Sequence, residues 1–309
     1  MLRRAMLAVS ASEQIHRFVT AMPRTRAIVG RYVAGDTTGD AVRVARQLRA
    51  ENLLVTLDYL GEDTTDAGRA AAVADEYVQL LGKLAAEGLT QGGAVEVSVK
   101  PTAVGLFLPA GGERTATGNI ARICAAARDA GTTVTLDAED HTAVDATLRV
   151  ASQLRAEFGD LGCVVQSALR RSEADCRALA APGTRVRLCK GAYSEPEAEA
   201  FTSRHDVDRS YARCLRILME GPGYPMVATH DPRLIRIASA LGLRRAPGSF
   251  EYQMLYGIRP DEQRRLAASG AKVRVYLPYG NDWYAYLVRR LAERPANVAF
   301  FLRSLRSSS

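Results

Sequence analysis

Near the end of this 309-residue chain, one tyrosine precedes two adjacent arginines by a single helical turn, in the stretch YLPYGNDWYAYLVRRLAER (276–294). A helix would place the phenol of Tyr286 and the guanidinium groups of Arg289 and Arg290 on one face. Glu293 follows on that face and could pair with either arginine in an ordinary surface helix. If the helix instead lies at the open end of the fold, where a ligand can bind, two guanidinium groups suit a carboxylate, which accepts forked hydrogen bonds. The spacing therefore favours a clamp for a small acid and leaves a surface helix as the alternative.

Eight short runs rich in β-branched residues recur along the chain, each followed by a segment of helical periodicity. They predict strands at 53–58, 95–100, 133–137, 163–167, 185–190, 225–229, 249–253 and 272–277. The clearest helix is predicted within 64–88, where apolar residues recur at three- and four-residue spacing. Eight strand–helix units predict a (β/α)₈ barrel over 51–309, preceded by helices over 1–50 that pack on it. An open doubly wound sheet is the alternative, but YLGED after the first strand is not its glycine-rich phosphate turn.

Polar side chains stand at the carboxyl end of every predicted strand, where (β/α)₈ barrels hold their chemistry. The strand-end residues are Asp58, Lys100, Asp137, Gln166, Lys190, Thr229 with His230, Gln253 and Tyr276, and Arg187 lies within the fifth strand. Taken singly, a lysine can belong to a salt bridge, His230 can be a core histidine, and Asp137 can cap the next helix. Glu139 and Asp140 are better candidates for that first-turn position, where they complement the helix dipole. Together the eight positions predict a polar mouth that holds a ligand.

The composition is that of a globular protein, with 47% hydrophobic and 24% charged residues, which excludes a disordered or fibrous chain. The net charge is +7, from 41 basic and 34 acidic residues, but the arginines are dispersed. Dispersion argues against nucleic-acid binding and leaves attraction to an anionic membrane surface open. Five cysteines without C-x-x-C spacing fit a reducing cytosol, and H-x-H and H-E-x-x-H spacings are absent, so we expect no metal site. No run of eighteen apolar residues occurs to span a membrane.

Several motifs together resemble the proline dehydrogenase family. The 276–294 stretch is similar to the family signature, and RLCKGAYSE (187–195) resembles the family's fifth-strand motif. The remaining motifs follow in the family's order: KP (100–101), LDAED (136–140), VVQSALRR (164–171), ATHD (228–231) and FEYQMLYGI (250–258). The resemblance covers residues 53–301. It implies a distorted (β/α)₈ barrel that binds FAD non-covalently and oxidises L-proline to Δ¹-pyrroline-5-carboxylate, the first step of proline catabolism to glutamate.

The same resemblance implies a role for each residue of the mouth. The implied clamp on the proline carboxylate is Lys100, Arg289 and Arg290. The implied walls around the ring are Tyr193, Leu255, Tyr276 and Tyr286. Asp137 is implied to place Lys100 or a tyrosine hydroxyl, and Glu62 to close a gate by pairing with Arg290. The implied flavin contacts are Gln166, Arg187, Lys190, Gly191, Ala192, Thr229, His230 and Glu293.

The resemblance also implies partners for the reaction. The family usually passes its electrons to a membrane quinone, so we expect a cytoplasmic protein, with peripheral attachment to the inner face of the cell membrane left open. Without an aldehyde dehydrogenase domain after the barrel, the product is expected to pass to a separate pyrroline-5-carboxylate dehydrogenase. The alternatives are a Schiff-base aldolase using Lys100 or Lys190, a methylenetetrahydrofolate reductase, and a small-acid-binding protein without a cofactor. The reductase family offers no explanation for Tyr286 followed by the two arginines.

Overall fold

Eight parallel strands close into a barrel in the computed structural model, which describes residues 29–284, 286 and 287. The strands follow one another around the barrel in chain order, and the last pairs with the first. They are β1 (Leu54–Tyr59), β2 (Val95–Val99), β3 (Val134–Leu136), β4 (Gly162–Gln166), β5 (Arg185–Cys189), β6 (Tyr224–Ala228), β7 (Glu251–Leu255) and β8 (Val273–Tyr279). The prediction of a (β/α)₈ barrel is confirmed, and every strand boundary lies within two residues of its predicted position.

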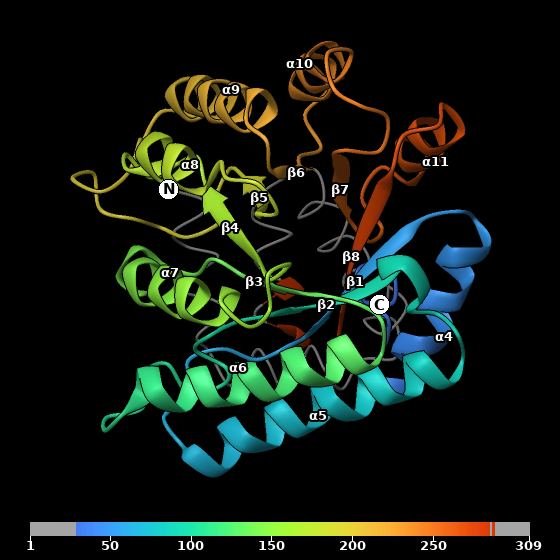
Figure 1. Ribbon diagram of the computed structural model, residues 1–309, viewed down its shortest axis with the longest axis vertical. Helices are drawn as coiled ribbons and strands as arrows, with labels where there is room; N and C mark the ends of the chain where they lie inside the picture. Colours follow the sequence, from blue (N-terminus) through green and yellow to red (C-terminus); the bar gives the residue numbers. More distant parts are fainter. Residues whose placement is uncertain (1–28, 285, 288–309) are drawn as a thin grey trace, which may run out of the picture.

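The helices form a ring around the strands (Figure 1). They are α4 (Thr38–Ala50), α5 (Ala67–Ala86), α6 (Gly112–Asp129), α7 (His141–Arg155), α8 (Ser172–Leu179), α9 (Arg204–Glu220), α10 (Pro232–Gly242) and α11 (Pro260–Ala268), with the short 3₁₀ helix η1 (Gln91–Gly93) before β2. The helix predicted within 64–88 is confirmed as α5. Helix α4 packs against β8 and β1, and it ends at the predicted boundary near residue 50. The division into two domains stays a prediction, because residues 1–28 lie outside the described part.

The barrel keeps charge on its inside and hydrophobic packing on its outside. Successive side chains of a strand point to opposite faces, so in β2 the residues Val95, Val97 and Val99 join the core under the helices. Glu96 and Ser98, between them, are also buried but hydrogen-bond to residues of other strands. Because the barrel wall is tightly packed, a side chain can enter the interior of the barrel only from a strand position that points inward.

The loops at the carboxyl ends of the strands are fixed by helix caps and one glycine. Asp140 caps α7 through the backbone N–H of Thr142, and Asp231 caps α10 through that of Arg233. After β8, Gly280 takes a φ of +114°, and a Cβ there would lie 2.9 Å from the ring of Tyr59. The two caps fix where the loops after β3 and β6 end and their helices begin.

Among the described residues, no helix combines the length and the apolar character needed to cross a lipid bilayer.

Candidate active site at the carboxyl ends of the strands

The first buried ion pair of the mouth joins the ends of β1 and β2. The Nζ of Lys100 donates to both carboxylate oxygens of Asp58, at 2.6 and 2.7 Å, and both side chains are almost fully buried. Burial alone would lower the pKa of Lys100, but the Asp58 and Asp137 carboxylates outweigh it and raise that pKa. The raised pKa favours the ammonium form of Lys100, which argues against a Schiff-base role for it, because a Schiff-base lysine must first lose its proton.

A second network joins β3, β5 and β8 around Asp137. One Asp137 oxygen accepts from Arg187 Nη1 at 2.6 Å and from Ser98 Oγ at 2.8 Å, and the other accepts from the hydroxyl of Tyr276 at 2.7 Å. The Arg187 guanidinium also lies 5.2 Å from the centre of the Tyr276 ring. Burial, with the charge of Asp137 beside it, raises the pKa of Tyr276 well above its usual value, so the phenol stays a hydrogen-bond donor. We call Asp58, Lys100, Asp137, Arg187 and Tyr276 the mouth cluster.

The geometry decides between the two tasks that the sequence left open for Asp137. Asp137 holds a tyrosine hydroxyl, that of Tyr276, whereas the hydrogen bonds of Lys100 go to Asp58. Asp58 stood among the predicted strand-end residues without a task of its own. The register was the missing signal, because Asp58 pairs with Ser98 and so lies beside the end of β2.

Two predicted strand ends lie deeper in the barrel than expected. Strand β7 begins and ends two residues later than predicted, so Gln253 is its middle residue, and Tyr276 is the fourth of the seven residues of β8. Gln253 accepts a hydrogen bond of 2.5 Å from Arg187 Nε. The predicted wall residue Leu255 is the actual end of β7. The predicted strand was extended over Ser249 and Phe250, which precede β7 in the structure.

Glu139 does not occupy the first turn of α7, which corrects the sequence interpretation. Its carboxylate is buried and accepts from the backbone N–H of Thr102 at 3.0 Å and from the hydroxyl of Thr102. Its backbone carbonyl accepts from Gln166 Nε2 at 2.7 Å. The cap of α7 is Asp140 alone. Burial raises the pKa of Glu139 to about 7, although the hydrogen bonds from Thr102 act in the opposite direction.

Three of the predicted flavin contacts lie at the β5–β7 side of the barrel with protein partners of their own. Lys190 falls on the outward side of the alternation, and its Nζ binds Asp208 of α9 at 2.5 Å and Asp231 at 3.1 Å. The ring nitrogen Nε2 of His230 accepts from the backbone N–H of Leu255 at 2.9 Å. Thr229 is buried, and its hydroxyl accepts from the backbone N–H of Asp231. Their roles toward a flavin stay predictions.

The loop after β5 carries Gly191, Ala192 and Tyr193 and is tied to α7. Glu195, farther along it, binds the backbone N–H of His141 at 3.1 Å and the ring nitrogen Nδ1 at 2.6 Å. Gly191 has a φ of +106°, and a Cβ there would lie 3.3 Å from the Ala168 Cβ and from the Gln166 Oε1. The backbone is therefore open at Gly191 only because that residue has no side chain.

The residues around β5 fit a flavin. Arg187 is 4% exposed, and its Nη2 makes no hydrogen bond with any described residue, although a carboxylate oxygen of Glu96 lies 3.9 Å from it. Buried donors in proteins normally have a partner. A flavin offers ring carbonyl and nitrogen acceptors for such a donor, and the side-chain-free backbone at Gly191 permits a close approach beside it. Both features lie on the side where the sequence placed the cofactor.

The loop between β1 and α5 borders the other side of the mouth. It carries Glu62, which is partly buried and whose charge acts on both Lys100 and Glu139. Tyr286 is buried in a small apolar cluster with Leu60, at the start of that loop. The chain after β8 thus returns beside Glu62. Arg289, Arg290 and Glu293 lie outside the described residues, so the clamp and the gate stay predictions.

The opposite half of the barrel contains buried charges that the sequence did not bring to attention. Glu96 binds Arg185 at 2.5 Å, and Glu251 binds Arg274 at 2.7 Å. Glu96 also lies 3.6 Å from Arg274. We call these four residues the floor cluster, because each is the first or second residue of its strand. The alternation in VEVSV and RVRLC indicates that Glu96 and Arg185 point to the inside of the barrel. Which residues pair with each other depends on strands far apart in sequence and could not be predicted from it.

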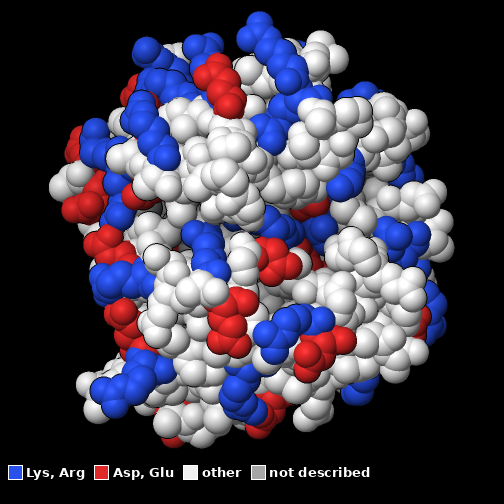
Figure 2. Space-filling model, in the orientation of Figure 1, with Lys and Arg blue, Asp and Glu red and all other residues white. Residues whose placement is uncertain are grey.

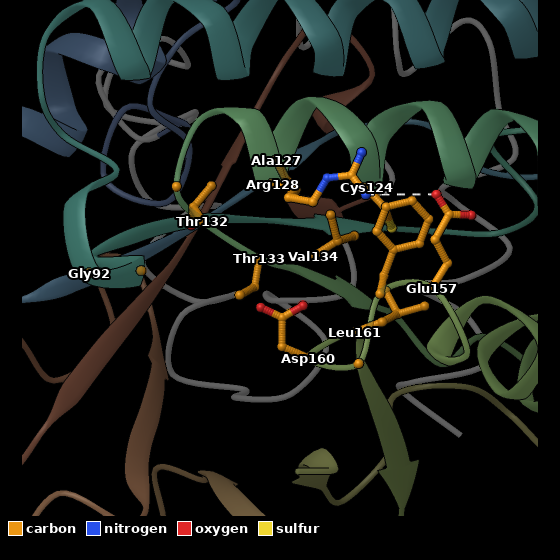
Figure 3. Close-up of a pocket in the computed structure, with 14 residues that line it drawn as sticks. Gly92, Cys124, Ala127, Arg128, Thr132, Thr133, Val134, Glu157, Asp160 and Leu161 are labelled. Atoms are coloured by element: carbon orange, nitrogen blue, oxygen red, sulfur yellow. Dashed lines mark ion pairs between the residues drawn. The ribbon is translucent and has the colours of Figure 1, made fainter.

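A cavity of about 530 Å³ lies at the same end as the floor cluster, away from the mouth. Figure 3 shows it between the end of α6 and the starts of β3 and β4, with Arg128 paired to Glu157 at its edge. Burial raises the pKa of Cys124, on its wall, to about 12, so the thiol stays protonated and unreactive. Barrel enzymes act at the other end, so we assign this cavity no part in the chemistry.

Comparison with known proteins agrees with the family resemblance. The sequence profile described as "Proline dehydrogenase" matches residues 41–303. The chain belongs to the proline dehydrogenase family. It is 38% identical to proline dehydrogenase 1 of Bacillus subtilis (strain 168), over 99% of both chains. It is also 38% identical to the proline dehydrogenase of Deinococcus radiodurans, over 98% of this chain and 97% of that one. The family and the enzyme class predicted from the motifs are therefore confirmed.

Solved structures agree on the fold of the proline dehydrogenase barrel. Proline utilization A (PutA) from Bdellovibrio bacteriovorus, inactivated by N-propargylglycine, superposes with a TM-score of 0.81 over 95% of this chain at 24% identity. The match covers 36% of that longer chain. PutA from Bradyrhizobium japonicum superposes with a TM-score of 0.73 over 89% of this chain and 31% of its own. At these identities the likeness bears on the fold alone.

Proposed function

We propose that the protein oxidises L-proline to Δ¹-pyrroline-5-carboxylate with bound FAD, as the first step of proline catabolism to glutamate. Membership of the proline dehydrogenase family supports the reaction. The observation in the structure that carries the proposal is the mouth cluster, where an ammonium, a guanidinium and a phenol from three separate strands converge on two carboxylates from two others. Such convergence at the carboxyl ends of the strands is what a barrel enzyme requires.

Charge balance explains why two further arginines are needed. In the mouth cluster, Asp58 offsets Lys100 and Asp137 offsets Arg187, and Glu62 adds a negative charge nearby. A carboxylate substrate would therefore meet an excess of negative charge among the described residues. Arg289 and Arg290, one turn beyond Tyr286, supply the missing positive charge on our proposal. The helical start at Trp283 and the burial of Tyr286 beside Leu60 support that position.

The protein's own contribution to the reaction is to bind the substrate in position and to exclude water from it. Lys100 with Arg289 and Arg290 would bind the carboxylate, and the side chains of Tyr193, Leu255, Tyr276 and Tyr286 would enclose the ring. The positive charges of Arg289 and Arg290 would disfavour a proton on the ring nitrogen, and hydride loss requires the free amine. The phenol of Tyr276, held by Asp137, would crowd a hydroxyl on the ring and so favour proline over hydroxyproline.

FAD is the cofactor that the site would hold. When bound, it supplies the acceptor for the hydride that leaves the proline ring carbon next to nitrogen. Arg187 would donate to it through Nη2, and Gly191 and Ala192 would present backbone to it. Gln166, Lys190, Thr229, His230 and Glu293 complete the proposed set of contacts. No step of this proposal needs a metal ion or a nucleic acid.

We further propose that electrons leave to a membrane quinone and that the cytoplasmic protein docks peripherally on the membrane. The supporting surface is α10 with the loop after it, where residues 232–250 contain four arginines, of which Arg233 pairs with Asp208 and Asp231, and no Asp or Glu. Leu243 is 88% exposed and Ile237 38% exposed on that surface. Figure 2 shows basic side chains beside uncharged ones at the upper edge, where Figure 1 places α10. A basic surface with exposed leucine suits anionic lipid.

The product would pass to a separate pyrroline-5-carboxylate dehydrogenase.

An absorbance scan under anaerobic conditions tests the proposal. The purified protein, reconstituted with FAD where needed, should show the flavin bands and lose them on addition of L-proline. A panel of quinones should then restore the bands. A protein that takes up no flavin, or a flavin that stays oxidised in proline, would rule the reaction out. Trapping of an adduct with borohydride in a colourless protein would instead favour the aldolase.

A further inference from the structure

We infer that Glu139 and Thr102 form a positioning pair that holds the β1–α5 loop, and with it Glu62, over the substrate site. The motifs gave Glu139 only a place at the helix start, and the reaction proposed above makes no use of it. Glu139 is buried at the mouth, 4% exposed, and accepts two hydrogen bonds from one residue, Thr102. A buried carboxylate needs a strong structural reason, because its desolvation is unfavourable.

Thr102 connects that carboxylate to the loop on the far side of β2. The backbone N–H of Asp63 donates to the Thr102 hydroxyl oxygen at 2.9 Å, and that of Thr64 donates to the Thr102 carbonyl at 3.2 Å. The same hydroxyl donates its proton to Glu139. A continuous chain of hydrogen bonds therefore runs from the Asp63 amide through the threonine hydroxyl to the Glu139 carboxylate.

The loop held by this chain is conformationally strained next to Glu62. Asp63 has a φ of +55°, in the left-handed region, which aspartate enters more readily than most residues but still at a cost in free energy. Gly61, on the other side of Glu62, has a φ of +157°. Such a backbone persists only where its surroundings hold it, and the contact to Thr102 is on the residue that carries the strain. Loss of the Glu139–Thr102 contact would let Asp63 relax and would move Glu62.

The charge of Glu139 sets how firmly the chain is held. An ionised carboxylate accepts charge-assisted hydrogen bonds, which are stronger than those to a neutral acid. Lys100, after β2, favours the ionised form, whereas Glu62, in the β1–α5 loop, and burial oppose it. Asp137 and Asp140 are the charged groups beside it on its own loop. With a pKa of about 7, the carboxylate changes its charge near neutral pH, and the loop should be held more firmly above that pH than below it.

The gate itself belongs to the proposed function, on which this step rests, so the test needs one measurement independent of turnover. We would measure hydrogen-exchange protection of the Asp63 and Thr64 amides at residue resolution, at pH 6 and pH 8. Thr102→Val removes the acceptor of Asp63 but leaves the backbone acceptor of Thr64. Protection of Asp63 should then fall on the order of tenfold more than that of Thr64. Thr102→Ser keeps a hydroxyl and should restore protection.

Glu139→Gln tests the charge without removing the side chain. Wild-type protection of Asp63 should be lower at pH 6 than at pH 8, and Glu139→Gln should show little difference between them. In the enzyme with FAD, Glu139→Gln should raise the KM for L-proline several-fold at pH 8 and change kcat much less, on the order of twofold at most. At pH 6 the variant and the wild type should have similar KM values.

A matched control lies one residue farther along. Asp140 and Thr142 form another carboxylate–threonine pair, with the hydroxyl of Thr142 2.6 Å from Asp140, but it caps α7 on the exposed side. Asp140→Asn and Thr142→Val should leave the Asp63 amide and the pH profile as in wild type. Equal Asp63 protection in wild type, Glu139→Gln and Thr102→Val would overturn the inference. A wild type that does not oxidise proline would instead overturn the proposed function and leave the exchange result standing.

Discussion

The two ends of the barrel interior both contain buried charge, yet they differ in what the charges leave unsatisfied. In the floor cluster two carboxylates face two guanidinium groups, and Glu251 accepts from Arg274 and Gln253. In the mouth cluster Arg187 keeps one buried nitrogen without a hydrogen bond to described residues, 3.9 Å from Glu96 of the floor cluster, and acidic groups outnumber basic ones once Glu62 is included. Buried charge alone therefore does not mark a site. What marks the site is a buried donor without a hydrogen bond to described residues, together with an excess of negative charge at the open end of the barrel.

The largest expected effect is in the floor cluster and concerns stability. Glu96→Gln leaves Arg185 and Arg274 with less countercharge in a fully buried setting. Breaking such a buried pair costs about 3–5 kcal/mol of unfolding free energy. Denaturant unfolding should show this loss. Exposed ion pairs contribute less than about 1 kcal/mol to the free energy of unfolding. A loss in that range would mean that the buried pairs of the floor cluster stabilise the fold no more than pairs on the surface.

The pH dependence of the same variant gives a second measurement. Burial of Glu96 opposes its ionisation, but the neighbouring guanidinium groups outweigh burial and hold the pKa of Glu96 well below its usual range. Its contribution to stability is present above the unfolded-state pKa and is lost as pH falls toward the folded-state value. Wild type should therefore lose stability more steeply than Glu96→Gln as the solution is made acidic.

Next in size is the mouth pair of Lys100 and Asp58, where turnover should suffer more than folding. In Asp58→Asn the ammonium loses its principal partner, and burial then lowers the pKa of Lys100. We expect kcat/KM for L-proline to fall on the order of 10²-fold, mainly through KM. Asp75→Asn, which removes an exposed pair with Arg122, is the control and should leave kcat/KM near wild type. Equal effects of the two variants would refute the proposed role of Lys100.

A smaller effect is expected where the backbone opens toward the proposed cofactor. Gly191→Ala puts a Cβ at a φ of +106° and 3.3 Å from Ala168. Gly183, at a φ of +76° with no atom within 4 Å of its virtual Cβ, is the matched control. Both alanine variants should lose about 1–2 kcal/mol of stability from the left-handed conformation. Only Gly191→Ala should also lower the flavin content of the purified protein. Normal flavin content in that variant would place the cofactor elsewhere.

The barrel could be predicted because its signals are local, whereas the pairings of its interior could not. Short runs rich in β-branched residues, such as VEVSV and RVRLC, located the strands. The Asp58–Lys100 pair joins residues 42 positions apart, and Arg274 and Glu251 are 23 apart, so only the register of the closed barrel brings them together. The task assigned to Glu139 was wrong for the same reason.

The outward position of Lys190 could have been recognised from the sequence. It follows Val186 and Leu188 at two-residue spacing, so the parity of β5 already places it toward α9 and α10. Arg289 and Arg290 show the opposite case. Their spacing from Tyr286 gave the strongest functional signal in the chain. The structure describes this motif only as far as Leu287, so both arginines lie outside the described residues.

The smallest expected effect separates two tyrosines of one strand. Tyr276 faces the mouth and donates to Asp137 at 2.7 Å, whereas Tyr279 packs under the helices and its hydroxyl lies 3.3 Å from Glu76. Each Tyr→Phe variant should lose about 1 kcal/mol of stability, the usual net value of one hydrogen bond. Asp137 stays satisfied in Tyr276→Phe, because Arg187 and Ser98 still donate to it. The fold of the mouth should therefore survive.

Only the inward tyrosine should alter the choice of substrate. Removing the Tyr276 hydroxyl vacates space beside the proposed position of the ring, so the ratio of kcat/KM for L-proline to that for hydroxyproline should fall several-fold, on the order of 1 kcal/mol in differential binding. In Tyr279→Phe that ratio should equal the wild-type value, although the stability loss is similar. If both variants shift the ratio alike, the change comes from loosening of β8, and the inward face of the barrel is not what selects the substrate.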